Sequence, residues 1–127
     1  MPVHALLFSD VVDSTSIVER LGDTAAAALW TEHDRLARAL IERHRGREID
    51  RSDGFFLLFD ACADAAAFAA DYHTALRSLQ LVARVGIHHA PVTLRTNPPE
   101  AVARGAKPLE VEGLAKPLAA RVMSLAR

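Results

Sequence analysis

The sequence predicts an α/β (α+β) fold in which helices pack on one face of a mostly antiparallel β-sheet. Apolar runs of strand length alternate along the chain with longer stretches of helical periodicity. Two of the runs, 48–51 and 55–59, flank Ser52-Asp53-Gly54, a turn signal typical of a β-hairpin. No linker rich in glycine and proline divides the 127 residues, so we expect a single domain over 1–127.

The first part of the chain is predicted to form one strand and two helices. Residues 4–9 (HALLFS) are a short apolar run of strand length. Residues 13–16 (DSTS) supply side chains that favour a helix start, and the helix that follows ends at Gly22. A longer helix is then expected over 23–45.

The longer helix is predicted to be amphipathic. Five apolar residues lie on or near one face: Ala28, Leu29, Leu36, Leu40 and Ile41. His33 and His44 lie on the same helix without partners in register, and we expect both side chains to face solvent.

The second part of the chain is predicted to add further helix and sheet. Asp60 can cap an alanine-rich helix over 61–79, and the β-branched run 81–88 is expected to be a strand. Prolines and glycines recur over 90–108, which predicts a long irregular segment. A final helix is expected over 112–126.

The composition excludes several classes of partner. Hydrophobic residues make up 50% of the chain, charged residues 24%, and the net charge is -1. This balance gives no electrostatic basis for binding nucleic acid or an anionic membrane. Cys62 is the single cysteine, so no internal disulfide can form, and no apolar stretch approaches the roughly 20 residues of a membrane span. We therefore expect a cytoplasmic protein.

Four motifs in the chain resemble those of the class III nucleotide cyclases, the family of adenylate and guanylate cyclase catalytic domains. LLFSDVVDSTSIVERLGD is similar to the family's opening strand and phosphate loop, and GREIDRSDGFFLLF is similar to its central hairpin. RVGIHHAPV resembles the next strand, and EGLAKPLAARVMSLA resembles the signature helix. The motifs occur in the family's order, and the resemblance covers nearly the whole chain.

The resemblance implies a ferredoxin-like sandwich that forms a head-to-tail homodimer with nucleotide sites at the interface. It also implies a reaction: metal-dependent conversion of ATP, favoured over GTP, to a cyclic nucleotide and pyrophosphate. Because Arg127 ends the sequence just after the signature helix, the domain is expected to be short at its C-terminus relative to the family.

Two aspartates each end or flank an apolar run and match the family's metal-binding pair. These are Asp10 and Asp53, and the resemblance adds the backbone carbonyl of Val11 and two Mg²⁺ or Mn²⁺ ions per site. Carboxylate oxygens suit hard cations, and two such ions can lower the pKa of the ribose 3′-hydroxyl and neutralise charge on the triphosphate. The residue pattern alone leaves another interpretation open, because Asp53 within Ser-Asp-Gly can be a turn residue.

The resemblance also assigns the phosphates and the transition state. The backbone N–H groups of Val12, Asp13, Ser14 and Thr15 lie at a helix start and would cradle the phosphates. Arg121 matches the arginine that stabilises the pentavalent phosphate, a task suited to a guanidinium with several donors and a permanent charge. The alternative is a solvated helix arginine.

The base-reading and ribose-orienting positions depart from the family pattern. Glu110 falls at one base-recognising position, while Asp50 and then Arg51 follow where the family has a lysine. Pro117 replaces the asparagine that orients the ribose and offers no side-chain hydrogen bond. These departures leave a second hypothesis open: a catalytically weak or inactive module of the same fold that binds a nucleotide or a partner protein.

Overall fold

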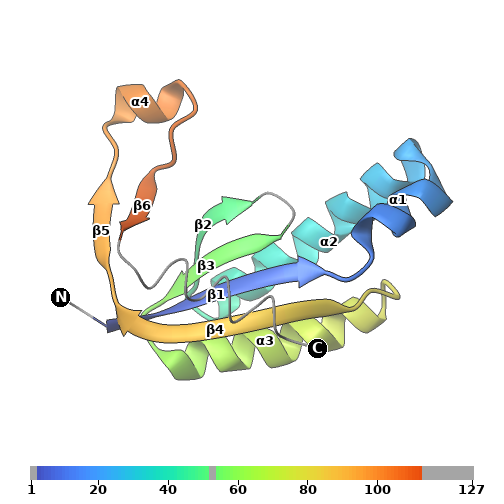
Figure 1. Ribbon diagram of the computed structural model, residues 1–127, viewed down its shortest axis with the longest axis horizontal. Coiled ribbons are helices and arrows are strands. Elements are labelled where there is room, and N and C mark those ends of the chain that lie inside the picture. Colours follow the sequence, from blue (N-terminus) through green and yellow to red (C-terminus); the bar gives the residue numbers. More distant parts are fainter. Residues whose placement is uncertain (1–2, 52–53, 113–127) are drawn as a thin grey trace.

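The computed structural model describes residues 3–51 and 54–112, and its centre is a four-stranded antiparallel sheet. The strands are β1 (Val3–Val11), β2 (Arg47–Arg51), β3 (Phe55–Phe59) and β4 (Ala83–Pro91), in the order β2-β3-β1-β4 (Figure 1). β1 pairs with both β3 and β4, and β2 with β3. The predicted strands and the antiparallel pairing of β2 with β3 are confirmed.

Three helices follow the predicted order. They are α1 (Ser14–Leu21), α2 (Asp23–Arg43) and α3 (Cys62–Arg77). Their apolar residues form one core cluster with alternate residues of β1 and β3, and Leu7, Leu57 and Phe68 are among its members. Because successive side chains of a strand point to opposite faces, the helices cover one face of the sheet. The predicted α/β fold with helices packed on an antiparallel sheet is confirmed.

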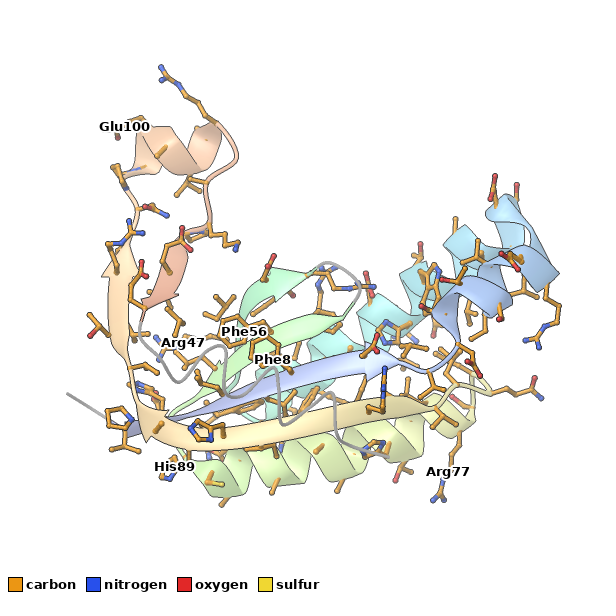
Figure 2. The ribbon with its side chains drawn as sticks, in the orientation of Figure 1. Phe8, Arg47, Phe56, Arg77, His89 and Glu100 are labelled. Atoms are coloured by element: carbon orange, nitrogen blue, oxygen red, sulfur yellow. The ribbon has the colours of Figure 1, made fainter. Side chains whose placement is uncertain are left out.

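The opposite face of the sheet carries a second apolar cluster. Its buried members come from the strands and the segments that join them: Leu6, Ile49, Phe56, Leu58, Val92 and Val111. Phe8 and Phe56 stack face to face on neighbouring strands, with ring centroids 4.4 Å apart (Figure 2). All five residues of β3 are buried, because both faces of this strand are covered.

The segment predicted to be irregular is largely ordered, so that prediction was wrong in part. After β4, the chain forms β5 (Thr93–Thr96), α4 (Pro99–Ala103) and β6 (Leu109–Glu112), and β5 pairs with β6 in an antiparallel ribbon. We call this segment the arm. It projects away from the main sheet in Figure 1. Its prolines lie at the ends of elements, where a missing N–H costs no ladder bond. The helix predicted over 112–126 lies outside the described residues, except that Glu112 belongs to β6.

The helix starts differ from the predictions. Asp13 occupies the N-cap of α1 without a side-chain cap bond, and α3 begins at Cys62 with Ala61 as its N-cap. Asp60 is not the cap; its carboxylate accepts from Arg47 Nη2 at 3.1 Å. In the described part of the chain, no helix is both long and apolar enough to cross a membrane.

The predicted solvent exposure of His33 was wrong. This side chain is 2% exposed and lies in the buried stripe of α2 with Ala26, Ala37 and Ile41. The helical spacing alone carried this signal, because His33 stands four residues before Ala37 and eight before Ile41 on the same face.

Candidate functional site

Asp10 lies near the C-terminal end of β1, where its side chain is 25% exposed. In the register of the sheet it stands opposite Arg84 of β4, and Arg84 Nη2 donates to Asp10 Oδ2 at 2.6 Å. Arg84 Nε is buried and has no hydrogen-bond partner among the described residues. The end of the central strand therefore holds one carboxylate beside a guanidinium.

The turn of the β2–β3 hairpin lies directly against the same end of β1. The Phe55 N–H donates to Ser9 Oγ at 3.0 Å. A Cβ built on Gly54 would lie 1.7 Å from the Ser9 carbonyl oxygen and 3.2 Å from the Asp10 Cα. Only glycine permits so close a backbone approach. The residue that follows Asp53 in the chain thus meets Asp10, while Asp53 itself lies outside the described residues.

The N-terminus of α1 has the geometry of an anion site. Asp13 takes a left-handed conformation with φ of 57° and turns the chain from β1 into the helix. The Ile17 N–H donates to the Asp13 carbonyl at 3.0 Å. The amides of Ser14 and Thr15 precede this bond, so they have no acceptor within the helix. Amides at this position suit a phosphate.

The Val12 amide differs from the other three predicted phosphate donors. It donates to the Val82 carbonyl at 2.8 Å and is therefore already engaged. An open cavity of about 260 Å³ lies at this turn and is lined by Val12, Asp13, Ser16, Ile17, Arg20, Gln80 and Val82.

The predicted base-reading residues are joined by one that the sequence did not indicate. Lys107 of the arm places its Nζ 3.4 Å from Asp50 Oδ2 on β2. Asn97 Nδ2 donates to the Lys107 carbonyl at 2.6 Å and lies 3.4 Å from Glu110 Oε2. The arm therefore brings Lys107 to Asp50, and Asn97 links the Lys107 backbone to Glu110. Sequence reasoning missed Lys107 because the arm was predicted to be irregular.

Arg51, the other predicted base-reading residue, is bound to α2. Its Nη2 donates to Asp34 Oδ1 on α2 at 3.0 Å, and its guanidinium carbon lies 5.0 Å from the centre of the Phe55 ring. The assignment of Arg51 to the base stays a prediction. In this structure its guanidinium joins the hairpin to α2.

A buried polar network continues from Asp34 into the core. His33 Nδ1 lies 2.8 Å from Asp34 Oδ1, and His33 Nε2 lies 2.7 Å from the Tyr72 hydroxyl. Burial lowers the pKa of His33, and Asp34 opposes this in part. Burial raises the pKa of Tyr72 to about 12. Burial alone would raise the pKa of Asp34, but hydrogen bonds from His33 and Arg51 lower it overall.

The buried histidine makes stability depend on pH. Because the pKa of His33 is lowered in the folded protein, the unfolded chain binds more protons below about pH 6.5. We expect the free energy of unfolding to fall as pH drops from 7 to 5, by at most about 1.4 kcal/mol per pH unit. Asp34 titrates below this window, since its pKa is lowered from an already acidic value. Urea melts of the wild type and His33→Gln at each pH measure the two slopes.

The His33→Gln slope should be flatter between pH 5 and 7, and the two curves should run parallel between pH 7.5 and 8.5. Equal slopes in the acidic range would contradict the role assigned to His33.

Among the described residues of the site, the Asp10 side chain offers the chemistry of a metal ligand. Among residues 3–51 and 54–112, no three His, Cys, Asp or Glu side chains gather closely enough to hold an ion. Asp10 is the described member of the predicted pair, and the Val11 carbonyl follows it. A partly exposed carboxylate with a neighbouring carbonyl oxygen is the donor chemistry that Mg²⁺ and Mn²⁺ take, so these residues fit the implied ions. Arg121 and Pro117 lie outside the described residues.

Solved structures with the same arrangement are nucleotide cyclases. The adenylyl cyclase CyaB from P. aeruginosa matches with a TM-score of 0.87 at 16% identity, over 98% of this chain and 72% of that one. An adenylate cyclase from Trypanosoma brucei in its monomeric state matches with a TM-score of 0.84 at 20% identity, over 100% and 71%.

The guanylate cyclase domain of RhGC from Catenaria anguillulae, in complex with GTP, matches with a TM-score of 0.83 at 17% identity, over 99% and 74%. No family model and no curated protein matches the sequence. The protein therefore has the fold of the class III adenylyl and guanylyl cyclase catalytic domains.

Proposed function

We propose that this chain is a divergent nucleotide cyclase domain that converts ATP, in preference to GTP, to the cyclic monophosphate and pyrophosphate. The observation that carries the proposal is the contact between the hairpin turn and Asp10: Gly54, one residue after Asp53, lies against Ser9 and Asp10. In a cyclase fold, a site that two carboxylates share requires this contact. The location we propose is the cytoplasm.

Each part of the substrate has residues to meet it. Asp10, Asp53 and the Val11 carbonyl would hold two Mg²⁺ or Mn²⁺ ions, which when bound lower the pKa of the ribose 3′-hydroxyl and neutralise triphosphate charge. The amides at the start of α1 would take phosphate oxygens, and Arg121 would stabilise charge that develops at the α-phosphate.

The base would meet a cluster of both charges. Glu110 can accept from an exocyclic amine, and the Lys107 ammonium beside Asp50 supplies a donor where Asp50 replaces the lysine of the family pattern. We propose that Arg51 supports this cluster by anchoring β2 to α2 through Asp34. The two halves of each nucleotide site would come from the two copies of a homodimer.

A second candidate function is a cyclase-like module that binds nucleotide or a partner protein without turnover. Two observations favour it. Pro117 cannot orient the ribose, and Asp10 is already paired with Arg84 at 2.6 Å, which a metal ion would have to share or displace.

One assay distinguishes the two functions. Purified protein is incubated with ATP or with GTP and Mn²⁺, and cyclic product is separated by liquid chromatography. We expect cyclic AMP in excess of cyclic GMP, and complete loss of product when EDTA removes the metal. Product that persists in EDTA would overturn metal dependence, and no product from either nucleotide in a dimeric preparation would favour the binding module.

A further inference from the structure

Lys107 of the arm is held both at its backbone and at its side chain. The Lys107 carbonyl accepts a hydrogen bond from Asn97 Nδ2 at 2.6 Å. At the other end of the residue, Lys107 Nζ lies 3.4 Å from Asp50 Oδ2 on β2. The Asp50 carboxylate is itself oriented, because its Oδ1 accepts the N–H of Arg51 at 2.9 Å. The Lys107 ammonium is therefore held at one place beside β2.

Asn97 organises the part of the arm that carries Lys107. Its N–H donates to the Pro108 carbonyl at 3.1 Å, and its Oδ1 accepts from Arg95 Nη1 at 3.2 Å. Its Nδ2 lies between two acceptors, the Lys107 carbonyl at 2.6 Å and Glu110 Oε2 at 3.4 Å. Because a guanidinium only donates and a backbone carbonyl only accepts, the amide has one orientation. A single partly buried side chain thus links the backbone of Lys107 to the carboxylate of Glu110.

Lys107 and Glu110 together offer one donor and one acceptor to the edge of a base. A lysine ammonium only donates, and a carboxylate only accepts. Adenine presents an acceptor at N1 beside the donor at its exocyclic N6, whereas guanine presents the acceptor O6 beside donors at N1 and N2. The order of donor and acceptor is therefore reversed between the two purines. Either base can satisfy the two residue types, so the relative placement of the side chains decides which base fits.

We propose that Asn97 is a positioning residue that selects the purine by fixing Lys107 relative to Glu110. This inference rests on the proposed function, in which these two side chains meet the base. Asn97 acts through the Lys107 carbonyl and the Glu110 carboxylate, and it makes no contact with the nucleotide itself. The donor to the base comes from the arm, because β2 carries a carboxylate, Asp50, at this place.

The test uses Asn97→Asp, which keeps the shape of the side chain and the acceptor for Arg95 but removes the Nδ2 donor. Two ratios are measured with Mn²⁺: kcat/KM for ATP over that for GTP, and the calorimetric affinity for 3′-deoxy-ATP over that for 3′-deoxy-GTP. The analogues lack the attacking hydroxyl and cannot be cyclised. We expect both ratios to fall by at least about tenfold, the discrimination that one well-placed hydrogen bond supplies.

The matched control is Glu112→Gln, the same exchange between a carboxylate and an amide in the same ribbon. Glu112 accepts from Arg95 Nη2 at 2.8 Å, so among the described residues its loss removes no bond to Lys107 or Glu110. Both ratios should stay at their wild-type values. An equal fall in Glu112→Gln would mean that any loosening of the arm alters base preference, and it would overturn the role of Asn97. Unchanged ratios in Asn97→Asp would overturn it as well.

A second variant, Asn97→Ala, removes the same donor without placing a new charge near Glu110. The bonds of the Asn97 side chain all run to other residues of the arm, so we expect this variant to fold with the main sheet intact. It should lower both ratios as Asn97→Asp does. If only Asn97→Asp lowered them, repulsion between carboxylates would explain the change, and the positioning role would be wrong.

Lys107→Met shows whether Asn97 acts through Lys107. The Lys107 side chain is 37% exposed, so the loss of its ammonium should leave the fold intact and lower both ratios. Adding Asn97→Asp to this variant should lower them little further, because residues that act through one another are not additive. Full additivity of the two changes would contradict the proposal.

The two ratios separate this inference from the proposed function. A wild type that makes no cyclic nucleotide but discriminates between the 3′-deoxy analogues would refute the cyclase activity, and the affinity ratios of the variants would then decide the role of Asn97. A wild type that binds both analogues equally, or binds neither, would overturn the inference, since no base preference would exist for Asn97 to set.

Discussion

Replacing Gly54 with alanine is expected to lower the free energy of unfolding by about 3 kcal/mol and to abolish metal-dependent activity. The added Cβ would lie 1.7 Å from the Ser9 carbonyl oxygen and 2.7 Å from its carbonyl carbon. Both are backbone atoms of a central strand, so no side-chain rotation relieves the collision, and overpacking of this kind typically costs about 1–3 kcal/mol. Urea denaturation followed by circular dichroism measures the change in stability.

Gly22→Ala is the matched control for that experiment. Gly22 has φ of 82°, and a Cβ there would meet nothing within 4 Å. Its cost is backbone strain alone, about 1–3 kcal/mol, and a full helix separates it from Asp10 in the chain. If both alanine variants lost the same stability and Gly54→Ala kept wild-type turnover, the contact between the turn and β1 would have no functional importance.

The parts of the fold that could be predicted are those with a local signal. The β2–β3 hairpin is indicated by two apolar runs around Ser-Asp-Gly, and α2 by its apolar periodicity. The arm had no such signal. β5 and β6 are four residues each and pair across a proline-rich segment that reads as a loop, so only their pairing with each other defines them.

The same distinction applies to the candidate site. Asp10 could be predicted from its motif, because the apolar run that precedes it in the chain marks it as an aspartate near the end of a strand. The burial of His33 could have been inferred from its helical spacing, but the partners of Lys107 and His33 could not, since each lies far along the chain: Asp50 for Lys107, and Tyr72 for His33. The Tyr72 hydroxyl on the next helix satisfies the buried His33 Nε2, and no local sequence pattern indicates that pairing.

Replacing Asp10 with asparagine is expected to reduce cyclase turnover by at least about 10²- to 10³-fold, the loss typical of one transition-state electrostatic group. Asparagine keeps the shape of the side chain and removes the charge that a hard cation requires. Initial rates over a range of Mn²⁺ concentrations measure the effect, and the loss should persist at saturating Mn²⁺. Asp60→Asn, at the end of β3 and paired with Arg47, makes the same chemical change away from the site and should retain full turnover.

Loss of the ion pair between Asp10 and Arg84 is another explanation for that loss of turnover. Arg84→Met distinguishes this explanation from the loss of a metal ligand. Both Asp10→Asn and Arg84→Met break the same pair, whose two side chains are 25% and 37% exposed, so each should lose no more than about 1 kcal/mol of stability. If Asp10 acts as a metal ligand, Arg84→Met keeps the ligand and removes its competitor, so the half-saturating Mn²⁺ concentration should fall while turnover is retained. If Arg84→Met instead lost turnover as severely as Asp10→Asn, the carboxylate would matter as a partner of the guanidinium, and the assignment of Asp10 to the metal would be wrong.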